Sequence, residues 1–402
     1  MSTDPHRFLM PKEPRLSWAF LAGRSRFDHL PGFAQTVRRY LFFWARNAIF
    51  HSLKALNVSP GERVLVPAYI CAAAVEPIAA YGAEVVFYDV RKDCLPDFSE
   101  IEAKIDARTR AVLALHYFGF PQPIQQFRNL CDRRGLWLIE DCAHVLRGQL
   151  DGRALGSFGE ASVFSWRKFL PLFDGGELVL NCQRELDLEW GREGALFTLK
   201  VAKSLVDPLV EDGRHPLLRI PSRTIEVSKN VLLRLVGSSG RAKQPLAIYS
   251  SSASFDPKMV NFPMSRLSRM ILAHSDIPAV VAKRWSHYLH LQERLGRIDG
   301  LNLLFTPLPA GVCPWVFPIF FEDVPDAHIA LREIGIPAVT WGGVRYPGIS
   351  KALFPQAHFL YENLVFLPLH QNLEEQDLEL IAAAVRSVCQ TGRARRNAAR
   401  VL

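Results

Sequence analysis

The sequence predicts an α/β fold built on an open, largely parallel β-sheet. Short β-rich runs alternate with helix-like stretches along the first half of the chain, the order typical of this fold class. The runs are almost entirely apolar, as expected for strands buried on both faces of a parallel sheet. Hydrophobic residues make up 49% of the 402 residues and charged residues 22%, which excludes a disordered or collagen-like chain.

The elements follow one another from about residue 35, after a segment, 1–34, that is rich in Pro, Arg and Phe and is interpreted as an N-terminal arm. Strands are expected at 64–67, 84–88, 111–115, 136–139, 161–164 and 177–180. Helices are expected between several of them, at 47–56, 70–81 and 122–134. In the last of these Ile124, Phe127 and Leu130 recur every third residue.

The alternation of strands and helices stops at about 183–256. We interpret this segment as a basic insertion in a large domain that spans 35–256. A helix is expected at 195–211. Six basic residues and one acidic residue lie between Arg219 and Lys243. This charge bias is typical of a solvated insertion, and the alternative is a surface that faces an anionic ligand or partner.

A smaller C-terminal α+β domain is expected at 257–390. Its elements are a long helix at 277–295, short strands near 316–321 and a closing amphipathic helix near 374–389. A basic tail, 391–402, follows with four arginines and no acid, and is expected to fray.

Charge and cysteine usage narrow the function classes. The formal net charge of +8 favours anionic ligands, but it is too small for its length to indicate a nucleic-acid partner. The seven cysteines are scattered and never spaced C-x-x-C, so neither a disulfide framework nor a metal site is expected, and a reducing cytoplasm is the simple interpretation. We find no apolar run long enough for a signal peptide or a membrane span.

Polar residues follow two of the predicted strands where ligands of open α/β sheets collect. Asp141 and His144 follow the strand at 136–139, while Ser165 and Lys168 follow the strand at 161–164. A lysine amine can form a Schiff base with an aldehyde cofactor. Pyridoxal phosphate (PLP) also needs an acid beside its pyridine nitrogen. An ordinary ion pair or turn is the alternative interpretation of the same residues.

An ordered set of motifs over roughly 35–390 resembles the DegT/DnrJ/EryC1/StrS family, the PLP-dependent sugar aminotransferases of fold type I. The motifs are PGERVLVPAY (60–69), YGAEVVFYDV (81–90), LHYFG (115–119), IEDCAH (139–144), GSFG (156–159), Phe164-Ser165, Lys168 followed by DGG (174–176), and FLPLH (366–370) with Leu373. The resemblance implies a large domain with a mostly parallel seven-stranded sheet and PLP as cofactor.

The resemblance also assigns roles at the cofactor. Lys168 matches the catalytic lysine that carries PLP as a Schiff base, and Asp141 matches the acid at the pyridine nitrogen. His144 stands near the ring hydroxyl, with a hydrogen-bonded structural histidine as the alternative. Ser165 matches a serine near the phosphate. Cys71 occupies a position where many members have an aromatic residue over the ring.

The phosphate-binding turn departs from the family pattern. This chain has WARNA at 44–48, so Arg46 and Asn47 would occupy that turn, and a plain helix start is the alternative. Lys168 follows Ser165 by three residues, where the family typically has five. Arg167 is therefore expected to take over part of the phosphate contact.

Two further segments concern the partner subunit and the substrate. NFPMS at 261–265 resembles a family segment that reaches the cofactor of the neighbouring subunit, so Asn261 would complete a shared site in a homodimer. Pro263 replaces the family's arginine there. Arg345 in GGVRY (342–346) is a candidate to bind a substrate carboxylate or phosphate, with a surface salt bridge as the alternative.

The function implied is transfer of an amino group from glutamate to a nucleotide-linked keto-sugar, for polysaccharide or glycoconjugate biosynthesis. A PLP-dependent sugar dehydratase is one alternative, which Lys168 argues against because such relatives typically have His there. A non-catalytic or regulatory relative is another. A glycosyltransferase-like nucleotide binder would need an Asp-x-Asp motif near a strand end, and the sequence has none so placed.

Overall fold

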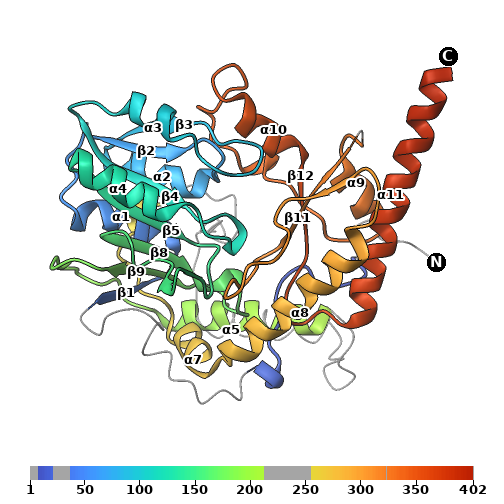
Figure 1. Cartoon of the computed structure of the whole chain (residues 1–402). Coiled ribbons are helices and arrows are strands. Elements are labelled where there is room, and N and C mark those ends of the chain that lie inside the picture. The colour runs from blue at the N-terminus through green and yellow to red at the C-terminus, as the bar shows by residue number, and fades with distance from the viewer. Residues whose placement is uncertain (1–7, 21–36, 212–254, 323, 402) are drawn as a thin grey trace, which may run out of the picture.

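The structure is a computed structural model that describes residues 8–20, 37–211, 255–322 and 324–401 (Figure 1). The basic segment 219–243, the end of the predicted insertion and most of the predicted arm lie outside the described residues. The domain boundaries drawn from the sequence therefore remain predictions.

A seven-stranded sheet forms the larger half of the molecule, in the order β1-β9-β8-β5-β4-β2-β3. The strands are β1 (Arg38–Phe42), β2 (Arg63–Pro67), β3 (Glu84–Tyr88), β4 (Thr109–Leu115), β5 (Trp137–Cys142), β8 (Ala161–Ser165) and β9 (Gly176–Leu180). The pairs from β3 across to β8 are parallel, and β9 runs antiparallel to both of its neighbours. The α/β class and the mostly parallel seven-stranded sheet are thus confirmed.

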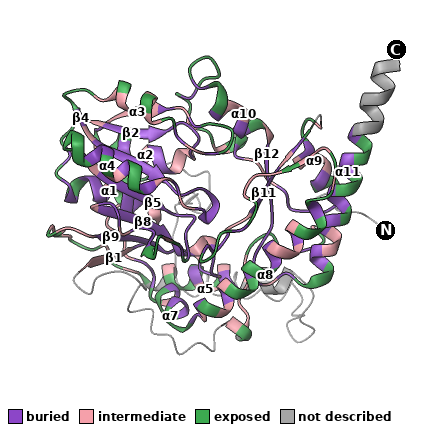
Figure 2. Ribbon diagram, in the orientation of Figure 1, coloured by how far each residue is buried: buried purple, intermediate pink, exposed green. Residues whose placement is uncertain are grey.

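Burial explains why the central strands read as continuous apolar runs. Every residue of β8 and β9 is buried, and β4 is buried from Ala111 to Leu115. Helices α1 (Ala45–Ala55), α2 (Ala72–Tyr81), α3 (Phe98–Lys104) and α4 (Ile124–Arg134) accompany the sheet (Figure 2). Ile124, Phe127 and Leu130, which recur every third residue on α4, form its buried face. Each of these large apolar side chains stabilises the fold by about 2 kcal/mol when it is buried away from water.

The predicted elements of the large sheet match closely, with one of its strands missed. β1 has two arginines, Arg38 and Arg39, and only its last residue is buried, so it lacks the apolar run that marked the other strands. A small hairpin of β6 (Gln149–Leu150) and β7 (Arg153–Ala154) also went unrecognised. Both depend on pairing partners rather than on local pattern.

The C-terminal half is an antiparallel three-stranded sheet with helices. Its strands are β10 (Leu301–Leu303), β11 (Phe317–Phe321) and β12 (Leu364–Leu367). Its helices are α8 (Ile277–Leu295), α9 (Ala327–Glu333), α10 (Pro355–Asn363) and α11 (Glu375–Val401), while α5 (Ala195–Glu211) and α7 (Arg266–His274) lie near the edge of the large sheet beside β1 and β9 (Figure 1). α8 begins at the predicted residue because Asp276 accepts a hydrogen bond from the Ala279 N–H.

The segment predicted as a basic tail is helical as far as Val401, where α11 ends (Figure 1), and its fraying stays a prediction. Ala and Arg, which dominate this stretch, are among the strongest helix formers and favour continuation of the helix.

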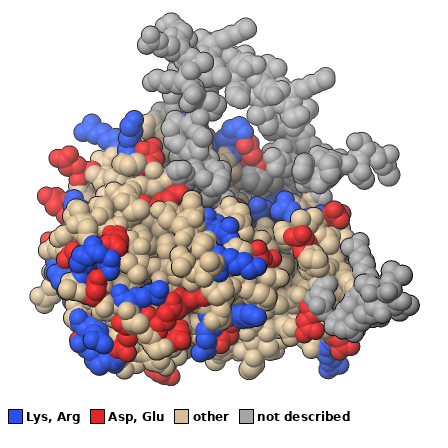
Figure 3. Space-filling model, turned by 90° about the horizontal axis from the view of Figure 1, so that it is seen from above, with Lys and Arg blue, Asp and Glu red and all other residues tan. Residues whose placement is uncertain are grey.

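The described surface mixes both charge signs, with Lys and Arg interspersed among Asp and Glu on the face in Figure 3. In the part of the chain that the structure describes, none of the helices combines the length and apolarity needed to cross a membrane. The seven cysteines all lie within the described residues, and none of them is in a disulfide there.

Candidate active site

The predicted catalytic pair lies at the ends of two adjacent strands. Asp141 is near the carboxyl end of β5, and Lys168 closes the 3-10 turn η3 (Trp166–Lys168) that follows β8. β5 and β8 are paired in parallel, so both ends open at one edge of the sheet. The two groups are close enough that each changes the pKa of the other.

Asp141 is a buried carboxylate that accepts a backbone hydrogen bond from the next residue but one. Burial raises its pKa, and the neighbouring Lys168 amine, the Ala143 N–H and His116 oppose that rise. The Ala143 N–H donates to Asp141 Oδ1 at 2.9 Å. A buried carboxylate in this state favours a cationic partner.

Lys168 has a pKa below that of an ordinary lysine. Burial is the main cause and the neighbouring Arg167 adds to it, while Cys71 and Asp141 oppose it. The Lys168 amine lies 4.7 Å from the centroid of the Trp315 ring. A neutral amine, the form that reacts with a carbonyl, is therefore more accessible here than in water.

His144 is buried between aromatic rings and is neutral. Its ring stacks on Trp315, with centroids 4.3 Å apart and planes at 20°, and lies parallel to Phe118 on a centroid distance of 5.8 Å. Burial and the Lys168 charge hold its pKa well below the ordinary value. Its Nδ1 accepts from the Phe118 N–H at 3.3 Å, so the proton resides on Nε2, which is left as a donor.

Gly119, in the LHYFG motif, brings the Trp315 segment up to this histidine. A Cβ at Gly119 would lie 2.4 Å from the Cys313 carbonyl oxygen and 3.0 Å from that of His144. Its φ of +98° also favours glycine. The close backbone approach allows the Trp315 N–H to donate to the Phe118 carbonyl at 2.8 Å.

Two arginines gather at the start of α1. The guanidiniums of Arg46 and Arg167 lie 4.4 and 5.1 Å from the Trp44 ring centroid. Burial lowers the pKa of each, and Arg167 adds to the effect on Arg46. Two partly desolvated cations beside a helix N-terminus make this corner favourable for an anion.

The remaining predicted residues surround this centre. Ser165 is buried at the end of β8. Cys71 precedes α2, and burial raises the pKa of its thiol, while Lys168, Asp141 and Arg46 all act on it. Cys71 also pairs through its backbone with Arg345, which is exposed and lies 5.9 Å from the Tyr361 ring centroid.

Asn47 and Asn261 both hydrogen-bond with other protein groups. The Asn47 amide donates to the Met259 carbonyl at 2.7 Å. The Asn261 carbonyl accepts from the Gly191 N–H at 3.0 Å, and its side chain hydrogen-bonds with His51. Their predicted contacts with a cofactor remain predictions.

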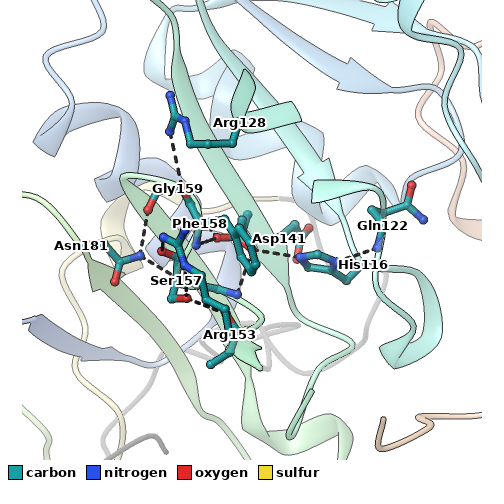
Figure 4. Close-up of polar contacts among 12 residues, drawn as sticks. His116, Gln122, Arg128, Asp141, Arg153, Ser157, Phe158, Gly159 and Asn181 are labelled. Carbon is teal, nitrogen blue, oxygen red and sulfur yellow. Dashed lines mark hydrogen bonds and ion pairs between the residues drawn. The ribbon is translucent and has the colours of Figure 1, made fainter. Parts of the chain in front are cut away.

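Glu140, next to Asp141 in sequence, is fully engaged as an anchor, and Figure 4 shows its partners His116, Phe158 and Gly159. Its Oε1 accepts from the Phe158 and Gly159 N–H groups, each at 2.6 Å, and its Oε2 accepts from the Gly156 N–H at 2.8 Å and from His116 Nε2 at 3.1 Å. His116 Nδ1 accepts from the Gln122 N–H, which fixes the proton on Nε2. The GSFG motif is thus a loop folded around one carboxylate. The proximity of His116, Glu140 and Cys142 does not make a cation site, because the lone pairs of Glu140 are already occupied.

Sequence reasoning missed Trp44 and Trp315. Trp44 stands two residues before Arg46 in the motif already singled out, so a nearby aromatic was available as a signal. Trp315 comes from the loop before β11 and reaches Lys168 only through the tertiary fold, so no local pattern marks it.

Comparison with known proteins agrees with this geometry. The family model of the DegT/DnrJ/EryC1/StrS aminotransferase family matches residues 45–187. A dTDP-4-dehydro-2,3,6-trideoxy-D-glucose 4-aminotransferase of Saccharopolyspora spinosa is 36% identical over 345 residues, covering 83% of this chain and 80% of that one. A GDP-perosamine synthase of Vibrio cholerae is 35% identical over 143 residues, which span 35% of this chain and only 39% of that protein.

Solved structures share the fold. The aminotransferase TlmJ of Streptoalloteichus hindustanus superposes with a TM-score of 0.60 at 24% identity, covering 88% of this chain and 86% of that one. Helicobacter pylori PseC, an aminotransferase of pseudoaminic acid biosynthesis, gives a TM-score of 0.61 at 18% identity, with 88% and 87% covered. The long match to the Saccharopolyspora enzyme, together with the family model, establishes that the chain belongs to the DegT/DnrJ/EryC1/StrS aminotransferase family.

Proposed function

We propose that this protein is a PLP-dependent aminotransferase that moves an amino group from glutamate to a nucleotide-linked keto-sugar. Family membership supports the reaction class. The substrate class rests on relatives named for GDP-, UDP- and dTDP-linked sugars. The observation that carries the proposal is that the Lys168 amine and the buried Asp141 carboxylate lie at one sheet edge, close enough for each to shift the pKa of the other.

The donor set fits PLP in each of its parts. An amine of lowered pKa suits the aldehyde, a buried carboxylate suits the pyridine nitrogen, and the Arg46–Arg167 corner suits the phosphate. The Nε2–H of His144 suits the ring oxygen. When bound, PLP supplies an electron sink for the carbon that loses a proton.

The protein's own groups then have separate tasks. Lys168, in its neutral form, accepts the proton from the amino donor's carbon and, in the second half of the reaction, delivers a proton to the sugar carbon that receives the amino group. Asp141 keeps a positive charge stable at the ring nitrogen. Ser165 and Asn47 add polar contacts near the phosphate, Cys71 packs against the ring, and Arg345 binds a carboxylate or phosphate of the substrate.

Absorption spectroscopy tests the cofactor and the reaction together. The purified protein with PLP is expected to be yellow from the lysine-bound cofactor, and glutamate is expected to bleach that band. K168A should lack the band, whereas exposed Lys200→Ala should retain it. A band that no amino donor alters would favour a regulatory relative, and no band in the wild type would reject PLP. A panel of nucleotide-linked keto-sugars, scored by glutamate consumption, tests the substrate class.

We also propose a cytoplasmic homodimer in which Asn261 completes the partner's site. If so, K168A and Asn261→Ala should each be inactive alone. An equimolar mixture that has exchanged subunits should recover about a quarter of wild-type activity, because half of its dimers are mixed and each mixed dimer has one intact site of two. No recovery from a mixture that has exchanged subunits would reject the shared site. An active N261A enzyme would reject the role of Asn261, and cell fractionation tests the compartment.

A further inference from the structure

Arg284 on α8 is a buried cation whose hydrogen bonds go to neutral groups. Its side chain is 1% exposed. Nη1 donates to the carbonyls of Trp315 at 2.9 Å, Leu369 at 2.9 Å and Pro314 at 3.4 Å, and Nε donates to Gln371 Oε1 at 3.1 Å. A buried guanidinium is costly to desolvate, so this arrangement calls for an explanation beyond packing.

The same side chain also reaches the segment that carries Lys168. Arg284 Nη2 donates to the Phe169 carbonyl at 3.4 Å, and its guanidinium lies 4.9 Å from the Phe169 ring centroid. Gln371, 3% exposed, donates to that carbonyl at 2.9 Å. Phe169 is the next residue after Lys168, so this oxygen is one residue away from the reactive side chain.

Arg284 therefore joins the two segments that meet at the amine. One segment carries Lys168, and the other carries Trp315, whose ring lies under the Lys168 amine and stacks on His144. Arg284 binds the backbone of both. Its planar fork can hold several carbonyls in fixed directions, which a lysine ammonium cannot do equally well.

We propose that Arg284 and Gln371 are positioning residues that hold the Lys168 amine against Trp315 and His144, so that α8 and the loop after β12 set the geometry of the catalytic lysine. The importance of this geometry for catalysis rests on the proposed function. The geometry itself can be measured without cofactor or substrate.

The test measures the ionisation of Lys168 in the cofactor-free, full-length protein. Acetic anhydride is applied across a pH series, and the labelling of the Lys168 peptide is followed by mass spectrometry against exposed Lys200 as internal reference. The groups that act on this amine are Cys71, Asp141 and Arg167, and none of them is altered. Arg284→Lys removes the fork but keeps the charge, and Gln371→Met removes the donor to Phe169 without changing the charge.

Both variants are expected to admit water around Lys168 and to raise its labelling midpoint by about one pH unit. Arg294→Lys is the matched control, because Arg294 is on the same helix, is half-exposed and pairs with Glu379 at 2.7 Å. It should leave the midpoint unchanged. With PLP and substrates, kcat should fall about 10- to 100-fold in R284K and Q371M. The change in KM should be smaller than this fall in kcat.

Unchanged midpoints in folded R284K and Q371M would overturn the proposal, as would an equal shift in R294K. If R284K does not fold, Q371M alone decides. A wild-type protein that fails to take up PLP would reject the proposed function. The labelling result would still decide whether Arg284 and Gln371 position Lys168.

Discussion

Two adjacent carboxylates, Glu140 and Asp141, illustrate how residue environment divides structural from chemical work. Glu140 receives four donors and anchors the loop at 156–159. Asp141 receives one backbone N–H and has the Lys168 amine as its cationic neighbour. The first is already satisfied by the fold, and the second retains the capacity to stabilise a ligand cation.

Asp141→Asn tests the electrostatic effect of the Asp141 carboxylate on the Lys168 amine. Asp141 raises the pKa of Lys168, so removing its charge should lower that pKa further and move the labelling midpoint to lower pH by about one unit. The pH midpoint of Lys168 labelling by acetic anhydride, measured in the cofactor-free protein, reports this shift. Exposed Asp151→Asn serves as the control, and an upward shift in D141N would contradict the assignment.

At the scale of elements, α1 and the sheet meet through a backbone contact at Gly176. A Cβ there would lie 2.1 Å from the carbonyl carbon of Trp44 and 2.3 Å from the Ala45 nitrogen. This glycine pairs with Phe42 on β1 and with Ser165 on β8. Its lack of a side chain thus sets the distance between the start of α1 and the segment that leads to Lys168.

Gly176→Ala is expected to destabilise the fold by about 2–3 kcal/mol, because the clash is with backbone that cannot rotate away. Thermal unfolding should show a clearly lowered Tm, together with weaker uptake of PLP. Gly194→Ala is the matched control, since a Cβ at Gly194 meets nothing within 4 Å. A wild-type Tm in G176A would show that α1 can move at little cost.

The sequence predicted the elements whose signal is local. The central strands are continuous apolar runs, and α8 has a capping aspartate, so both were placed closely. β1 was missed because its identity depends on pairing with β9. Within the site, Asp141 and Lys168 could be predicted from strand ends, whereas Trp315, Arg284 and Gln371 come from distant segments and lie together only in the folded chain.

At the scale of the whole molecule, buried histidines shape the response to acid. Burial lowers the pKa of His51 and His287 to about 4 and that of His370 to about 3. The unfolded chain takes up protons on these residues below about pH 6.5, while the folded chain does not. Stability is therefore lost as the pH falls from about 6.5 towards 4. Asp174, whose pKa burial raises to about 7, acts in the opposite sense.

His370→Gln should weaken this acid sensitivity. Glutamine can still donate to the Pro11 carbonyl, which His370 Nε2 contacts at 2.9 Å, but it takes up no proton on unfolding. Tm measured from pH 4 to 8 should fall less steeply towards acid than in the wild type. His274→Gln, at an exposed position, should keep the wild-type slope. If the slope of Tm against pH were unchanged in H370Q, His370 would not be one of the histidines that cause the loss of stability in acid.

The antiparallel pairing of β8 with β9 bears on the short spacing between Ser165 and Lys168. A crossover between parallel neighbours must travel the length of the sheet, but residues 166–175 only turn back at one edge, from Ser165 to its partner Gly176. Such a return can gain or lose residues while the strands on either side keep their register. The length of this loop can therefore change in evolution without disturbing the β-sheet scaffold.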